Sequence, residues 1–106
     1  MYNKNEIIRM FVNNEIISSK RDLKGSNIIC YYYENTNIRV LKNYSTIIAF
    51  VDCGENYNKV YLNKTKYSQT TTRNQNLIRY YASEIDELEY DDFIKLLRNK
   101  LFGKGC

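Results

Sequence analysis

The amino-acid sequence predicts an α+β fold with a short N-terminal helix, a four- to five-stranded antiparallel meander and two C-terminal helices. Apolar residues recur at helical spacing near both ends of the chain, which predicts the helices. Runs of β-branched and aromatic residues fill the middle, separated by groups of Asn, Asp and Gly, which predicts short strands joined by turns. A chain of 106 residues has room for one hydrophobic core, so residues 1–106 are interpreted as a single domain.

The first helix is expected over residues 4–13. Asn3 is placed to cap its N-terminus, and Glu6, three residues later, completes an Asn variant of the capping box. The apolar face of this helix consists of Ile7, Ile8 and Phe11. Asn14 follows its last turn, and residues 18–26 then form a polar connection.

The strands are expected in the middle third of the chain. Their predicted ranges are 28–33, 38–41, 46–51, 59–62 and a short fifth strand at 66–68. The run from Thr46 to Val51 is the most apolar and is expected to be the most buried. Because successive strand residues point to opposite faces, Tyr32 is expected to face away from Tyr31 and Tyr33.

Two further helices are expected at the C-terminal end. Threonines 70–72 offer hydroxyl caps to a helix over about residues 72–82. The last helix has apolar residues at i, i+3, i+4, i+7 and i+11, namely Tyr90, Phe93, Ile94, Leu97 and Leu101. Asp91 and Asp92 lie in its first turn, as the helix macrodipole favours, and Gly103 is placed to end it.

Several classes of function are disfavoured by what the sequence lacks. The absence of histidine removes the usual general base and the commonest metal ligand. The three cysteines, Cys30, Cys53 and Cys106, are too widely spaced for a metal motif and odd in number for a disulfide framework. No secretory signal follows Met1, and the longest apolar run, 47–51, is far shorter than the roughly 20 residues of a membrane span. We therefore expect a cytoplasmic binding protein with no catalytic residues, metal, cofactor or membrane contact; its oligomeric state is open.

The charges are unevenly distributed along the chain. The formal net charge is +4, yet one nine-residue stretch holds six acidic residues and no Lys or Arg, which leaves the other 97 residues at +10. The six acids are Glu84, Asp86, Glu87, Glu89, Asp91 and Asp92. Three interpretations are open: a solvated linker before a helix N-terminus, carboxylates that imitate nucleic-acid phosphates, or a cation site.

The basic residues of the second half of the chain alternate with tyrosines. Lys59, Lys64, Lys66, Arg73 and Arg79 surround Tyr57, Tyr61, Tyr67 and Tyr80. Basic and aromatic side chains on a small sheet can hold single-stranded nucleic acid by phosphate contacts and base stacking. The simpler interpretation is that outward strand positions carry Lys and Tyr for solubility and β propensity.

Residues 67–76, YSQTTTRNQN, resemble the YSxTTSRHQS-type signature of a small domain of unknown function found in many bacteriophage and mobile-element proteins. Residues 25–28, GSNI, resemble the "SNL" strand of that family, and residues 43–49, NYSTIIA, resemble its "SYxTxIA" segment. The three segments keep the family's order and span about residues 25–81. Asn74 stands where the family commonly has His, and Asn43 where it has Ser, so a role that needs that imidazole does not carry over.

On this resemblance, Tyr67 would anchor the last strand, and Thr71 or Thr72 would cap the following helix. Arg73 and Gln75 would project from the first turn of that helix, where a helix N-terminus favours anions.

The resemblance also implies a context, that of an accessory protein in an infected bacterial cell. By analogy with anti-CRISPR proteins, the leading hypothesis is an inhibitor that binds a host Cas effector stoichiometrically, with the acidic residues 84–92 in a basic groove of that partner. The alternative is a nucleic-acid-binding accessory protein that uses the five basic residues named above.

Overall fold

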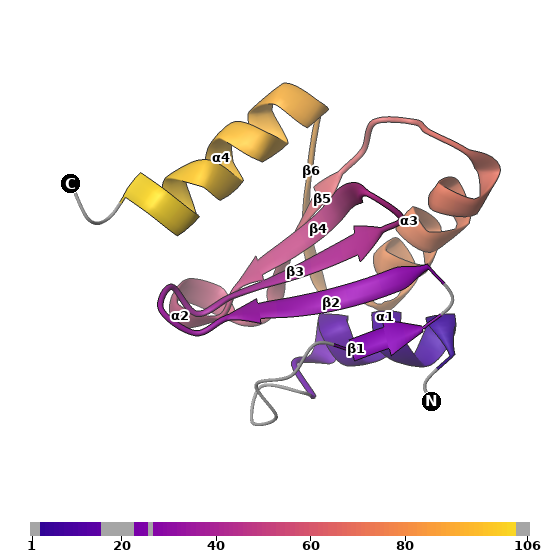
Figure 1. The fold of residues 1–106 in the computed structure, drawn as a ribbon, viewed down its shortest axis with the longest axis horizontal. Coiled ribbons are helices and arrows are strands. Elements are labelled where there is room, and N and C mark those ends of the chain that lie inside the picture. Colours follow the sequence, from indigo (N-terminus) through magenta and orange to yellow (C-terminus); the bar gives the residue numbers. More distant parts are fainter. Residues whose placement is uncertain (1–2, 16–22, 26, 104–106) are drawn as a thin grey trace.

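The computed structural model describes residues 3–15, 23–25 and 27–103 and shows an α+β fold (Figure 1). In chain order the elements are α1 (Lys4–Asn13), β1 (Leu23–Gly25), β2 (Ile28–Tyr33), β3 (Ile38–Asn43), β4 (Thr46–Asp52), α2 (Cys53–Asn56), β5 (Lys59–Asn63), α3 (Gln69–Tyr81), β6 (Glu84–Leu88) and α4 (Tyr90–Phe102). The predicted fold class is confirmed. Among the described residues, Cys30 and Cys53 form no disulfide, and Cys106 lies outside those residues.

One six-stranded sheet, in the order β1-β2-β3-β4-β5-β6, forms the centre of the molecule. The first five strands are successive antiparallel neighbours, as the meander requires, whereas β6 pairs with β5 in parallel. A parallel neighbour needs a crossover connection, and α3 provides it between β5 and β6.

Three strand predictions are corrected by this topology. Residues 66–68 were expected as a strand but form coil, because the chain leaves the sheet after Asn63 to enter α3. Residues 23–25 were assigned to a polar connection and 84–88 to a linker or helix approach, but both pair as edge strands. Edge strands are short and carry charge to avoid aggregation, so they lack the apolar alternation of inner strands.

Helices cover both faces of the sheet, and each face has its own apolar cluster. On one face α1 and α3 contribute Ile7, Ile8, Phe11 and Ile78 to a cluster with Leu41, Val51, Val60 and Leu62. On the other, Phe93 and Leu97 of α4 pack with Ile38, Val40, Phe50 and Tyr61. Figure 1 shows α4 separated from α1 and α3 by the strands. Strands β3, β4 and β5 are therefore buried on both sides. The prediction that β4 is the most buried strand is wrong, because β3 is buried at five of its six positions and β4 at five of its seven.

The ends of α1 follow the sequence prediction. The Glu6 backbone N–H donates to Asn3 Oδ1 at 2.9 Å, and Asn14 ends the helix in the left-handed conformation, with φ of 56°. At the other end of the chain, α4 ends at Gly103 as predicted, although that glycine keeps a right-handed φ of −77°. No helix in the described ranges has the length and apolar character needed to cross a bilayer.

The three consecutive tyrosines alternate between the faces of β2 as predicted. Tyr32 lies opposite Arg39 in the register, and the Arg39 guanidinium is 5.6 Å from its ring centroid. Tyr31 instead has the Lys42 ammonium 6.0 Å from its ring.

Candidate functional site

The acidic residues 84–92 lie along β6 and the first turn of α4, where three of the six meet basic side chains of the same molecule. Asp86 is 3.1 Å from Lys59 Nζ. Glu87 accepts two hydrogen bonds from Arg79, at 3.1 and 2.8 Å. Glu89 is 3.8 Å from Lys64 Nζ. The charges that are separate along the sequence are therefore partly neutralised in space.

The parallel pairing of β5 with β6 brings these charges together. Lys59 lies beside Glu84 and Tyr61 beside Asp86 in the register, so the basic strand and the acidic strand run side by side. The hydrogen bond from Lys59 to Asp86 raises the pKa of that lysine, and Tyr61 and Glu84 add to the shift. These pairs are solvent-accessible, so water screens them and each contributes little to stability.

The other three acids have no basic partner among the described residues. Glu84 accepts a long hydrogen bond, 3.4 Å, from Asn56 Nδ2. Asp91 and Asp92 are exposed in the first turn of α4, where the helix macrodipole favours them. The predicted acidic site therefore has two parts: carboxylates on or next to β6, of which three form ion pairs, and Asp91 and Asp92 in the first turn of α4, which form none among the described residues.

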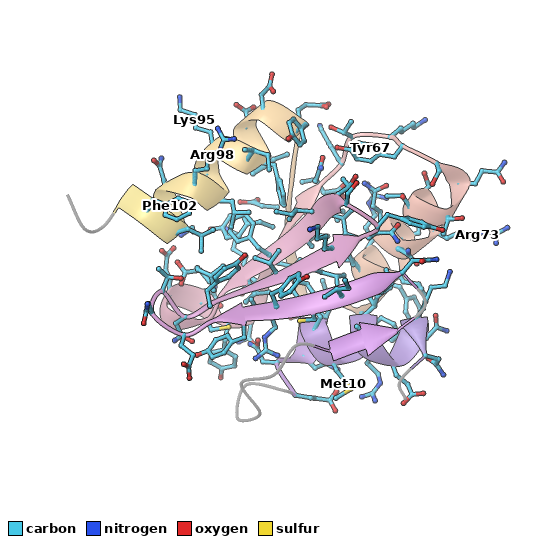
Figure 2. The ribbon with its side chains drawn as sticks, viewed as in Figure 1. Met10, Tyr67, Arg73, Lys95, Arg98 and Phe102 are labelled. Atoms are coloured by element: carbon cyan, nitrogen blue, oxygen red, sulfur yellow. The ribbon has the colours of Figure 1, made fainter. Side chains whose placement is uncertain are left out.

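The predicted basic site is divided in the same way. Lys59, Lys64 and Arg79 are the partners of the acidic residues described above. Lys66 and Arg73 are exposed and form no ion pair within the described part of the chain. They line a shallow hollow of about 400 Å³, the basic hollow, whose residues are Lys66, Tyr67, Ser68, Gln69, Thr72 and Arg73. Figure 2 shows Arg73 and Tyr67 on the same rim of the molecule, with Lys95 and Arg98 farther along it on α4.

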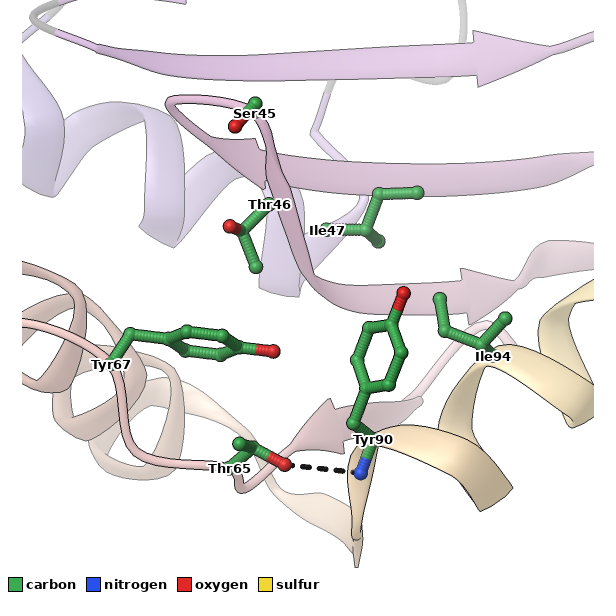
Figure 3. A pocket seen from close by; sticks show the side chains of 7 residues that line it. All are labelled: Ser45, Thr46, Ile47, Thr65, Tyr67, Tyr90 and Ile94. Atoms are coloured by element: carbon green, nitrogen blue, oxygen red, sulfur yellow. Dashed lines mark hydrogen bonds between the residues drawn. The ribbon is translucent and has the colours of Figure 1, made fainter.

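A second concavity adjoins the basic hollow and shares Tyr67 with it. This tyrosine pocket has a volume of about 490 Å³ and is lined by Ser45, Thr46, Ile47, Thr65, Tyr67, Tyr90 and Ile94. Figure 3 shows the Tyr67 and Tyr90 rings reaching into it from different segments, the coil before α3 and the first residue of α4. This pocket has no signature in the sequence, because its residues come from three separate segments and share no motif.

A buried amide network holds the segment that carries Tyr67. Asn63, at the end of β5, is fully buried and donates to Ile47 O at 3.2 Å and to the Tyr67 hydroxyl at 3.1 Å. Gln75 donates through Nε2 to the carbonyl oxygens of Asn63 and Thr65, at 2.6 and 3.0 Å. The coil between β5 and α3 is therefore fixed to the sheet and to the helix at once.

The same junction corrects three predictions made from the resemblance. Ser68, not a threonine, caps α3 by accepting from the Thr71 backbone N–H at 3.2 Å. The Thr71 hydroxyl instead donates to buried Asn43 Oδ1 at 2.8 Å. Gln75 is buried in the network, because a helical position two residues after exposed Arg73 faces the sheet. Tyr67 anchors the coil and not a strand.

These contacts give most of the YSQTTTRNQN segment a structural role. Its polar side chains Ser68, Thr71 and Gln75 hold the strand-to-helix junction, whereas Gln69, Arg73 and Asn76 are exposed to solvent.

A family model described as "Family of unknown function (DUF8033)" matches residues 3–94. The chain belongs to this family. The DUF8033 match includes every residue that lines the tyrosine pocket and the basic hollow, and all six acids of the 84–92 segment. No curated protein matches the chain, and no solved structure matches it.

The tyrosine pocket presents hydroxyl groups, two aromatic rings and two isoleucines, without a carboxylate or an amine among its lining residues. Within the described residues, no three Cys, Asp or Glu side chains converge as a metal site would require.

Proposed function

We propose that this protein is a non-catalytic accessory protein that binds single-stranded nucleic acid through the basic hollow and the adjoining tyrosine pocket. The pattern of ion pairs carries the proposal. Three of the five basic candidates are held by the protein's own carboxylates, whereas Lys66 and Arg73 are open to solvent beside exposed Tyr67. Open cations next to exposed rings supply the two contributions that single-strand binders combine, phosphate contacts and base stacking.

The electrostatic part of such binding should depend strongly on salt. Each phosphate neutralised by a basic side chain releases counterions, so the logarithm of affinity falls with the logarithm of salt concentration, by roughly 0.7 per contact for a single strand. Loss of both Lys66 and Arg73 should therefore flatten that slope by about 1.4.

The test is fluorescence anisotropy of a labelled oligothymidylate across a series of salt concentrations, with the wild type and K66A/R73A. The matched control is K95A/R98A, which removes one Lys and one Arg that are exposed on α4, outside both concavities. We expect weakened binding and a flatter slope for K66A/R73A and a much smaller change for the control. No binding at low salt, or equal effects of the two double variants, would contradict the proposal.

A second function is favoured by Asp91 and Asp92, which are exposed and have no basic partner among the described residues. We propose as the second candidate that the protein inhibits a host defence nuclease of the Cas effector type in the cytoplasm of an infected bacterium. The α4 N-terminal turn would enter a basic groove of the effector and compete with its nucleic acid.

The internal ion pairs determine how this second candidate must be tested. Reversing Glu87 or Glu89 would place two like charges together at Arg79 or Lys64, so an effect on inhibition would have a second possible cause. D91K/D92K changes only the open carboxylates and costs the helix about 0.3–1 kcal/mol for each residue. We expect D91K/D92K to lose inhibition of target cleavage while its circular dichroism stays native; full inhibition by this variant would refute the candidate.

A further inference from the structure

The tyrosine pocket is suited to a flat, uncharged group. Its volume of about 490 Å³ lies within the roughly 300–1,000 Å³ of sites that hold small organic molecules. Its lining combines the Tyr67 and Tyr90 rings with the apolar Ile47 and Ile94 and with the hydroxyls of Ser45, Thr46 and Thr65. Such a lining supports stacking and hydrogen bonding but offers no counter-charge to an ion.

Both rings are carried on backbone that is already held in place. Tyr67 is 43% exposed, and its hydroxyl accepts from buried Asn63. Tyr90 is 44% exposed, and its backbone N–H donates to Thr65 Oγ1 at 3.0 Å, the bond drawn in Figure 3. Exposed aromatic rings on an ordered backbone bind a ligand with a small loss of conformational entropy.

The charges that the pocket lacks lie immediately outside it. Tyr67 lines both concavities, so the tyrosine pocket and the basic hollow with its open Lys66 and Arg73 adjoin at this residue. A ligand that fills both must therefore join a neutral planar ring to an anionic group. A nucleotide within a strand has this composition.

We infer that the tyrosine pocket receives one unstacked base of a bound nucleic-acid strand, while adjacent phosphates contact Lys66 and Arg73. This inference rests on the proposed nucleic-acid function and adds the group that is recognised. Hydroxyl groups can donate or accept hydrogen bonds, so the pocket accommodates different bases without strict sequence preference.

The experiment compares a labelled oligothymidylate with an oligomer of equal length and charge that is abasic at every position. Y90A is the variant of choice, because Tyr90 makes its hydrogen bond through the backbone and its ring can be removed without breaking that bond. We expect Y90A to weaken oligothymidylate binding by about 5- to 150-fold, the equivalent of roughly 1–3 kcal/mol for one stacked base. Binding of the abasic oligomer should be weaker in the wild type and unchanged by Y90A.

Y80A is the matched control, since Tyr80 is 80% exposed on α3 and lines neither concavity. We expect it to bind both oligomers like the wild type. A random copolymer of glutamate and tyrosine, which offers rings and anions on a polypeptide, tests whether the surface is built for protein instead.

The possible outcomes distinguish failure of the base-pocket inference from failure of the proposed nucleic-acid function. If K66A/R73A weakens binding but Y90A changes the affinity for neither oligomer, the inferred base pocket is wrong and the proposed nucleic-acid function stands. If neither oligomer binds at low salt, the function fails and the inference with it. Tighter binding of the copolymer than of the oligothymidylate would overturn the inference in favour of a protein ligand.

Discussion

Two lysines approach the ring of Tyr61. Because they differ in burial, we expect them to contribute differently to the free energy of unfolding. Lys59 Nζ lies 5.1 Å and Lys100 Nζ 5.6 Å from the ring centroid. Lys59 pairs with Asp86 at the surface, whereas the side chains of Lys100 and Asp52 are only 11% and 4% exposed and lie 3.0 Å apart. Burial by itself would lower the pKa of Lys100, but its hydrogen bonds to Asp52 and Glu55 raise it overall.

We expect K100M to lower the free energy of unfolding by about 3 kcal/mol, because it leaves the buried Asp52 carboxylate without its cation. K59M, the matched change at the surface pair, should cost much less, because water screens an exposed ion pair. Urea denaturation of both variants at neutral pH checks this. Since the Lys100 pKa is raised in the folded state, the contribution of this lysine is complete below its ordinary pKa of about 10.4 and declines as the pH rises through the folded value. Equal losses for the two variants would contradict the difference in burial.

Arg39 is a second unusual charge. It is 0% exposed on β3, and among the described residues none of its three side-chain nitrogens has a hydrogen-bond partner. Its guanidinium contacts the Tyr32 ring, and such a contact is worth about 2 kcal/mol when desolvated. Burial raises the pKa of the nearby Cys53 thiol, and the positive charge of Arg39 opposes that rise.

We expect R39M to be more stable than the wild type by about 1–2 kcal/mol, because removing an unpaired buried charge relieves a desolvation penalty larger than the ring contact. R39K, which keeps the charge, should show no gain. The measurement is the denaturation midpoint of the two variants. A marked destabilisation of R39M would mean that the guanidinium has an acceptor in solution.

At the scale of elements, the junction between β5 and α3 is fixed by the Gln75 side chain as well as by the backbone bond from Lys64 to Leu88. Gln75 and Asn74 are neighbours on α3, and both are buried, 2% exposed each. The Gln75 amide donates to two carbonyl oxygens, whereas Asn74 Nδ2 has no hydrogen-bond partner among the described residues. The two residues therefore provide a matched comparison.

We expect Q75A to cost about 2–4 kcal/mol, since it leaves the Asn63 and Thr65 carbonyl oxygens without their donor. N74A should cost clearly less, because it removes an amide that makes no hydrogen bond through Nδ2. Thermal denaturation followed by circular dichroism ranks the two variants. A larger loss for N74A would refute the assigned role of the network.

At the scale of the whole molecule, the two apolar clusters share the strands of one sheet. Phe93 on α4 lies 5.3 Å, ring to ring, from Phe50 on β4, while Ile78 on α3 packs in the cluster on the other face. Because the helices on both faces pack on the same sheet, unfolding of the sheet would expose both apolar clusters to solvent. We therefore expect the two layers to unfold together.

We expect F93A to cost about 3–5 kcal/mol and I78A about 2–5 kcal/mol, and each to lower the stability of both layers. Hydrogen exchange of the α1 and α4 amides tests this, since each variant should raise exchange in both helices. Faster exchange of α4 alone in F93A would show that α4 unfolds as a separate unit.

Local patterns were enough to predict α1, the inner strands, the apolar stripe of α4 and the α+β class. The reason is that the apolar period of a helix or an inner strand lies within that segment and can be recognised there. The edge strands 23–25 and 84–88, the Ser68 cap and the burial of Gln75 required the tertiary structure.

The charge pattern shows the same division most clearly. The sequence determined that acids cluster at 84–92 and bases elsewhere. Only the fold decided that Lys59 and Lys64 face Asp86 and Glu89, because the crossover through α3 lays β6 beside β5. It also decided which cations remain open beside a pocket, since a surface assembled from separate segments has no signature in any one of them.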